Sequence, residues 1–164
     1  MKLRKITTQK DFDAIKSFFF DIFWEVPEYD LHHFKDAIEG RHDFQRLEYY
    51  LACEGDQIVG VTGIYADRPD ECWLGWFGVR PAYRQKGYAT QMLVAQLKIM
   101  RDYGYKVCRL YTDEELNKDA FALYLKNGFI KDSDWTTAHI VTMVQSLDGV
   151  TKATPWTGKP LALP

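Results

Sequence analysis

The sequence is poor in cysteine, lacks any apolar run of membrane length and has no excess of charge of one sign. Its three cysteines are odd in number and form no C-x-x-C pair, which is typical of reduced thiols inside the cell. The densest apolar run, residues 18–24, is far shorter than the roughly 20 residues of a membrane span. No apolar segment of signal-peptide type follows the first charged residues. We therefore expect a cytoplasmic protein with no membrane partner.

The charge is nearly balanced, because 21 Lys and Arg residues stand against 23 Asp and Glu residues and give a net charge of −2. This balance disfavours a nucleic-acid partner, although residues 80–86 form a local basic patch. A length of 164 residues suits one domain. We expect that domain over residues 1–147 and a loop-like extension over residues 148–164, whose Trp156 packs on the domain or on the second subunit of a homodimer.

Apolar periodicity and turn residues divide the chain into seven expected strands and four expected helices. The strands are expected over residues 3–6, 49–54, 58–66, 72–79, 106–112, 129–131 and 138–144. The helices are expected from a capping box at Thr8 to Pro27, from an N-cap at Asp30 to Gly40, from Gly87 to Gly104 and from Asn117 to Gly128. Hairpin strands mixed with β-α-β crossovers predict an α+β fold with a mixed sheet and helices on both faces.

The strand expected over residues 72–79 carries two tryptophans and two glycines. Period-two alternation predicts that Trp73 and Trp76 lie on opposite faces of the sheet. Isolated glycines inside a strand, here Gly75 and Gly78, indicate a bulge or the close approach of another part of the chain. We therefore expect this strand to be irregular.

A basic loop follows this strand and leads directly into the third expected helix. The first turn of a helix has unpaired amides and a partial positive charge, and therefore favours phosphate. Gly87 lets the backbone approach an anion without a Cβ, and Ala89 keeps the first turn small. Arg84 and Lys86 add positive charge. The loop matches neither the Walker motif nor the dinucleotide-binding G-x-G-x-x-G motif, so it predicts either a pyrophosphate site or an ordinary surface loop.

Two motifs together point to one family. Arg84-x-x-Gly87-x-Ala89 resembles the Q/R-x-x-G-x-G/A signature of the GNAT superfamily of acyl-CoA-dependent N-acetyltransferases. The second motif resembles the family's N-x-x-A-x-x-x-Y-x-x-x-G-F spacing, and its residues are Asn117, Ala120, Tyr124, Gly128 and Phe129. The order of expected elements is also similar to that of the family, so the resemblance covers the whole chain except the tail.

The resemblance implies a mixed, mostly antiparallel central sheet of about seven strands, with a V-shaped splay between the strand that ends at Val79 and the strand over residues 106–112. It implies acetyl-CoA as the co-substrate. Main-chain groups of Phe77, Gly78 and Val79 would then pair with the pantetheine arm, and Asn117 would form a hydrogen bond near it. The pyrophosphate would lie against Arg84, Gln85, Lys86, Gly87, Tyr88, Ala89 and Thr90.

The resemblance also implies that Tyr124 protonates the departing thiolate, which is chemically reasonable because a tyrosine has a pKa near ~10 and a thiol near ~8.5. Many family members have a glutamate as general base where this sequence has Trp73. Glu71, two residues earlier, is the nearest acidic candidate, and a relay of water molecules is the alternative. The implied reaction is acetyl transfer to a primary amine of a small molecule or peptide by direct attack in a ternary complex. A non-catalytic acyl-CoA-binding module is the other hypothesis.

The acceptor amine is expected near residues 21–30, which are both acidic and aromatic and therefore suit a cation with an apolar body. A helix end with ordinary solvated carboxylates is an equally simple interpretation. The four histidines show no metal-ligand spacing with cysteines or carboxylates, so no metal is expected, and they are His32, His33, His42 and His139. His139 is expected to be a plain strand residue rather than part of the site.

Overall fold

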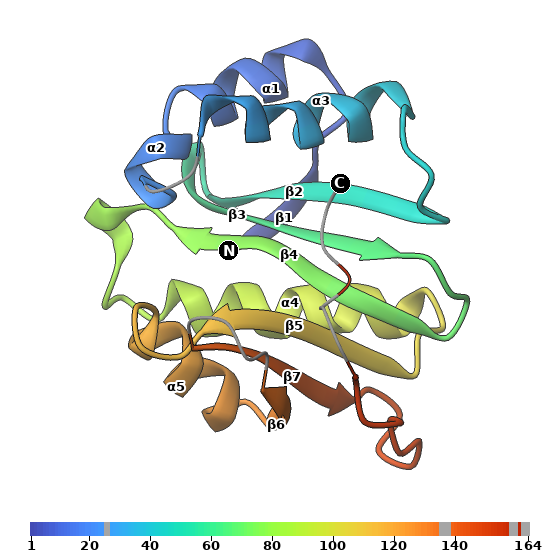
Figure 1. Ribbon diagram of the computed structural model, residues 1–164. Helices are drawn as coiled ribbons and strands as arrows, with labels where there is room; N and C mark the ends of the chain where they lie inside the picture. Colours follow the sequence, from blue (N-terminus) through green and yellow to red (C-terminus); the bar gives the residue numbers. More distant parts are fainter. Residues whose placement is uncertain (25–26, 135–138, 158–160, 162–164) are drawn as a thin grey trace.

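The computed structural model describes residues 1–24, 27–134, 139–157 and 161 of the chain (Figure 1). The strands are β1 (Lys2–Lys5), β2 (Arg46–Glu54), β3 (Gln57–Ala66), β4 (Glu71–Val79), β5 (Val107–Asp113), β6 (Ile130–Asp134) and β7 (Ile140–Ser146). The helices are α1 (Gln9–Lys16), α2 (Phe19–Ile22), α3 (His32–Glu39), α4 (Tyr88–Asp102) and α5 (Lys118–Lys126), and two short 3-10 helices are η1 (Glu28–Leu31) and η2 (Pro81–Tyr83).

The seven strands form one open sheet in the order β1-β2-β3-β4-β5-β7-β6. Every neighbouring pair is antiparallel except β4 and β5, which are parallel. Parallel neighbours need a crossover, and α4 provides it between these two strands. The expected α+β fold, with a mixed and mostly antiparallel sheet of about seven strands, is confirmed.

Helices cover both faces of the sheet because alternate strand residues are apolar on both sides. Tyr49 and Leu51 of β2 pack with Phe34 of α3 on one face. Tyr50, between them, packs with Leu97 of α4 on the other face. The helices α1, α2 and α3 therefore lie over one face and α4 and α5 over the other. No helix in the described part of the chain has the length and hydropathy of a membrane-spanning segment.

The first helical region differs from the expected pair of continuous helices. The capping box is present, because the Thr8 side chain accepts from the amide of Asp11 while the Asp11 carboxylate accepts from the amide of Thr8. The helix that it begins stops at Lys16, and α2 is a separate turn whose Phe19 is fully buried. The prediction of Asp30 as an N-cap is wrong: Asp30 lies inside η1, and α3 begins two residues later without a side-chain cap.

Candidate active site

The sheet opens between β4 and β5. Their parallel pairing covers residues 71–73 of β4 opposite residues 107–109 of β5, and no later described residue of β5 pairs with β4. The two strands then diverge toward their carboxyl ends (Figure 1). Residues 74–79 of β4 remain paired with β3 on one side, so their edge toward β5 has no strand partner among the described residues. The splay implied by the family resemblance is therefore present.

A bulge in β4 lies at this splay. Thr62 of β3 faces two residues of β4, Trp76 and Phe77, and Trp76 has a φ of +43°, an uncommon conformation for a residue other than glycine. The extra residue reverses the alternation of side chains. Trp76 packs on the ring of Phe23, 5.1 Å away, on the same face as Trp73. The prediction that the two tryptophans lie on opposite faces is wrong, because period-two counting fails across a bulge.

The glycine after the bulge allows α2 to lie against β4. A Cβ at Gly78 would be 2.2 Å from Cγ2 of Ile22 and 3.0 Å from Cζ of Phe23. Real Cβ atoms do not approach other atoms so closely, so only glycine fits here without a shift of the helix. The bulge and the close approach that the strand glycines predicted are both confirmed.

The loop before α4 presents a row of free amides. Gln85 and Gly87 both have positive φ angles, +59° and +79°, and Gly87 occupies the N-cap position of α4. The amides of residues 85–90 find no acceptor in the described part of the chain, and the first helical bond at this end runs from the amide of Gln91 to the carbonyl of Gly87. These six amides lie at the positive end of a 15-residue helix, an arrangement that binds anions.

Two basic side chains hold this loop in shape. Arg84 donates from Nε to the carbonyl of Val79 at 3.1 Å, and Lys86 donates from Nζ to the carbonyl of Ala82 at 3.0 Å. Both side chains belong to exposed residues, so they also keep positive charge beside the free amides. The loop therefore combines backbone donors with two cations.

Tyr124 and Phe77 come together beside the splay. Tyr124 is 5% exposed, and its ring lies 5.9 Å from that of Phe77 and 5.8 Å from that of Phe129. Burial, together with the nearby Cys108, raises the pKa of Tyr124, so the phenol is protonated at neutral pH. The Tyr124 hydroxyl has no hydrogen-bond partner among the described residues. Asn117 is exposed at the N-cap position of α5, where its side chain does not cap the helix.

Glu71 lies at the opposite, closed end of β4. Its carboxylate pairs with Nε of Arg109 at 3.0 Å, and Arg109, which is 1% exposed, also pairs with Asp132. Six residues of extended strand, about 20 Å, separate Glu71 from Phe77. The structure therefore does not bring Glu71 beside Tyr124, and its role as a base stays a prediction. Sequence reasoning missed Arg109, whose signal was a lone charge within an apolar strand.

The segment expected to meet the acceptor is described only in part, because residues 25–26 lie outside the described residues. Trp24 and Tyr29 are 76% and 70% exposed. His33, on α3, is 4% exposed and its ring lies 6.0 Å from that of Trp76. Burial, with a further contribution from His32, lowers the pKa of His33, so its ring is neutral at pH 7.

Comparisons with known proteins agree with this geometry. The chain is similar to the ribosomal-protein-S18-alanine N-acetyltransferase from Escherichia coli, with 15% identity over 99% of each chain and a TM-score of 0.71. For the IAA acetyltransferase from Bacillus cereus the identity is 18% over 88% of this chain and 98% of that one, with a TM-score of 0.68. The chain is also similar to the Campylobacter jejuni N-acetyltransferase PseH in complex with acetyl coenzyme A. The identity is 16% over 88% of this chain and 97% of that one, with a TM-score of 0.64.

These identities are low, so the solved structures establish the likeness of the fold. Among curated protein sequences, none matches the chain significantly. A family model, described as that of the acetyltransferase (GNAT) family, matches residues 12–129, which is more than half of the chain and includes both motifs. The chain therefore belongs to the acetyltransferase (GNAT) family.

Proposed function

We propose that this protein transfers the acetyl group of acetyl-CoA to a primary amine of a small molecule or peptide, by direct attack in a ternary complex. The observation that carries the proposal is the row of six amides over residues 85–90 without an acceptor in the described part of the chain. Such a row, at the start of a long helix, suits a pyrophosphate. Family membership and the acetyl-CoA complex of the similar Campylobacter jejuni enzyme support the choice of ligand.

The residues present fit acetyl-CoA along its length. Among the described residues, a Cβ at Gly87 would meet only Nε2 of Gln91, at 4.0 Å, which leaves room over the loop for a phosphate group. Arg84 and Lys86 would add charge at the pyrophosphate. The unpaired edge of β4 at residues 77–79 would bind the pantetheine arm as an added strand, because it offers main-chain donors and acceptors. Asn117 would hydrogen-bond to the same arm from α5.

The proposed chemistry needs a proton at the thioester sulfur. The amine nitrogen forms a bond to the acetyl carbon, the carbon–sulfur bond breaks, and the electron pair of that bond goes to sulfur. The Tyr124 phenol, kept protonated by its burial and without a hydrogen-bond partner among the described residues, would donate to that sulfur. A main-chain amide of β4 near the bulge would polarise the thioester carbonyl.

The amine must also lose a proton, because a lysine-like amine is mostly protonated at pH 7. The sequence leaves Glu71 and a relay of water molecules as the two routes. The pairing of Glu71 with Arg109, and its place at the closed end of β4, favour the relay. We therefore propose that a relay of water molecules accepts the proton of the acceptor amine.

The direct test is calorimetric binding of coenzyme A to the full chain and to Gly87→Glu. The introduced carboxylate would fill the anion site and repel the pyrophosphate, so we expect affinity to fall at least tenfold. Gly104→Glu is the matched control, because Gly104 flanks the other end of the same helix, has a φ of +88° and has nothing within 4 Å of its Cβ position. Glu at either position has similar backbone strain, because both glycines have a positive φ angle. Only Gly87→Glu changes the loop before α4.

Equal affinity in Gly87→Glu and the parent protein would contradict the anion site. A screen of thiol release from acetyl-CoA with polyamines, amino acids, aminoglycosides and peptides then identifies the acceptor. Tight binding with no thiol release for any amine would favour the non-catalytic acyl-CoA-binding module instead.

A further inference from the structure

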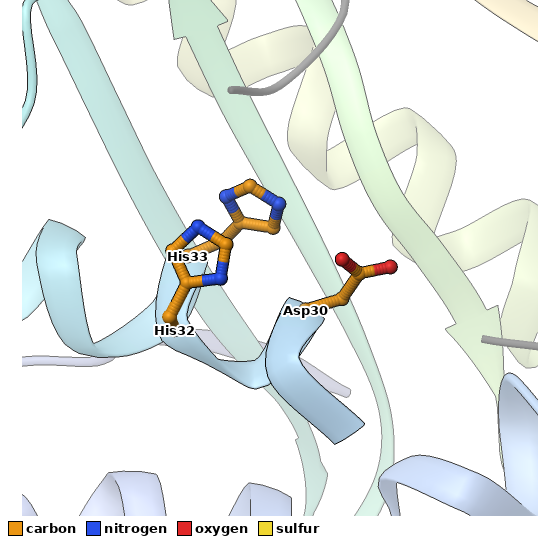
Figure 2. A group of neighbouring side chains, drawn as sticks. All are labelled: Asp30, His32 and His33. Atoms are coloured by element: carbon orange, nitrogen blue, oxygen red, sulfur yellow. The ribbon is translucent and has the colours of Figure 1, made fainter. Parts of the chain in front are cut away.

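Three potential metal ligands meet where η1 passes into α3. Asp30, His32 and His33 each offer one ligand atom, and these atoms lie within 4.8 Å of one another. Figure 2 shows the three side chains on this short turn, with the two imidazole rings next to each other. The sequence analysis expected no metal, because the spacing of these residues does not correspond to a common zinc motif.

The local backbone explains why the three side chains converge. Asp30 lies in η1 and His33 in α3, three residues apart across the junction of the two helices, a separation at which side chains share one side of a helical turn. His32 begins α3, and its ring lies with its centroid 4.0 Å from that of His33. The junction of η1 and α3 therefore brings two imidazoles and one carboxylate within 4.8 Å of one another.

The hydrogen bonds leave the ligand atoms available. Nδ1 of His32 donates to the carbonyl of Tyr29, which fixes the tautomer and leaves the lone pair of Nε2 free. A metal-binding histidine usually has such a bond from its other nitrogen. His33 is only 4% exposed, yet neither of its ring nitrogens has a hydrogen-bond partner in the described ranges 1–24, 27–134, 139–157 and 161. The same holds for the carboxylate of Asp30.

We propose that Asp30, His32 and His33 form a binding site for one divalent transition-metal ion, with Zn²⁺ as the preferred ion and one coordination position open. Two imidazole nitrogens and one carboxylate oxygen are a donor set that Zn²⁺ accepts, and a hard ion such as Mg²⁺ or Ca²⁺ prefers oxygen ligands alone. Ligand atoms around a tetrahedral Zn²⁺ are about 3.4 Å apart. The observed ligand atoms lie within 4.8 Å of one another, so binding of the ion requires the side chains to move closer together.

The site shares no residue with the part of the chain assigned to acetyl-CoA, although Asp30 belongs to the segment expected to meet the acceptor amine. None of its three residues belongs to the loop, strand edge or tyrosine assigned to acetyl-CoA. Its occupancy can therefore be measured with the metal alone, without any acetyl donor or acceptor.

The test is calorimetric titration of ZnCl2 into the full chain after treatment with a chelator, with Co²⁺ as a spectroscopic probe of the coordination. We expect one ion per chain and a visible Co²⁺ spectrum of a site with nitrogen and oxygen ligands. Asp30→Asn replaces the carboxylate ligand with a weaker, neutral amide oxygen and His32→Ala removes one imidazole, and we expect at least tenfold weaker binding in both. These two variants are chosen because His33 is buried and its replacement also perturbs packing.

His42→Ala is the matched control. The His42 ring contacts the carbonyl of Phe44 and lies outside the group, so its removal leaves Zn²⁺ affinity unchanged. Absence of heat and of a Co²⁺ spectrum with the parent protein would overturn the proposal. Equal Zn²⁺ affinity in the parent, Asp30→Asn and His32→Ala would overturn it too, because the ion would then bind elsewhere. Loss of metal affinity with unchanged coenzyme A binding in His32→Ala would separate this site from the acetyl-CoA site.

Discussion

At the scale of single residues, Tyr124 combines a buried ring with a hydroxyl that has no partner among the described residues. Core tyrosines usually hydrogen-bond their hydroxyl, because an unpaired buried hydroxyl is costly. The Tyr124 ring packs against Phe77 and Phe129, and its hydroxyl, which has no such bond among the described residues, is available to donate to a ligand. This is the physical basis for assigning it to the thioester sulfur.

We predict that Tyr124→Phe keeps the affinity for acetyl-CoA within twofold and lowers kcat by roughly 10²–10⁴-fold, the range of a general acid. The ring and its packing are preserved, so stability changes little. The measurement is the steady-state rate of thiol release with a poor amine acceptor, for which the chemical step is limiting. An unchanged kcat under these conditions would show that the hydroxyl has no part in the reaction.

Glu71→Gln is the companion variant. It removes the charge that pairs with Arg109 but keeps the shape of the side chain. If water carries the amine proton, this variant is less stable while the pH profile of kcat stays where it was. Loss of the acidic limb of that profile, together with a large fall in kcat, would return the role of base to Glu71.

The sequence predicts some residues of the site and not others for a definite reason. Gly87 and Tyr124 stand at fixed spacings inside motifs, so they are recognisable without the fold. The grouping of Asp30 with His33 depends on η1, a 3-10 turn at a place where the sequence pattern indicates a helix N-cap. The orientation of Trp76 depends on one positive φ angle, which no alternation pattern contains.

At the scale of elements, the start of α1 shows how local chemistry fixes a boundary. Burial alone would raise the pKa of Asp11, but hydrogen bonds from Arg4, the amide of Thr7 and Thr8 together lower it to about 2. The capping box that these bonds complete was visible in the sequence, because it needs only residues three apart.

We predict that the contribution of Asp11 to stability depends on pH. The folded pKa is below the ordinary value of 3.8, so the ionised form stabilises the fold above that value, and this is lost as pH falls toward 2. Asp11→Asn lowers the free energy of unfolding by about 2 kcal/mol at pH 7, and the difference shrinks toward zero near pH 2. Urea unfolding at a series of pH values measures it.

Asp13→Asn is the control for this series, because Asp13 is exposed and accepts only a surface bond from Gln9 in addition to its role in the helix backbone. We expect less than 0.5 kcal/mol at any pH. A pH-independent loss in Asp11→Asn would show that packing rather than ionisation explains its effect.

The boundary between α1 and α2 could not be predicted from the neighbouring residues alone. The apolar positions from Phe12 to Phe23 continue with helical spacing, yet the chain breaks between α1 and α2. The break lets Phe19 and Phe23 surround the ring of Trp76, 5.3 Å and 5.1 Å away. This packing joins residues more than fifty positions apart, so no short window of sequence contains it.

At the scale of the whole molecule, the described residues of the tail contact both halves of the sheet. Tyr65 of β3 donates to the carbonyl of Leu161 at 2.6 Å, and the amide of Trp156 donates to Asp132 of β6 at 2.9 Å. The Trp156 ring meets that of Trp73 edge to face at 4.9 Å. The expectation that Trp156 packs on the domain is confirmed, whereas a domain boundary at residue 147 stays a prediction.

We predict that Trp156→Ala lowers the free energy of unfolding by about 2 kcal/mol, equivalent to roughly 4–8 °C in Tm, through loss of the contacts with Trp73 and Arg109. Thermal unfolding followed by circular dichroism measures it. Val150→Ala is the control in the same tail, because Val150 is 80% exposed, and its Tm should not change. Equal Tm values for both variants would mean that the tail adds nothing to stability.

The unpaired margin of β4 has a consequence for solubility. Open strand margins usually lie at the rim of a sheet, where a second molecule can add a strand and begin aggregation. Here the margin lies in the interior of the sheet, with β5 on its far side, so a folded neighbour cannot reach it while a slender extended molecule can. The placement that would admit the proposed pantetheine arm therefore also keeps this margin from starting the strand-to-strand aggregation that open edges allow.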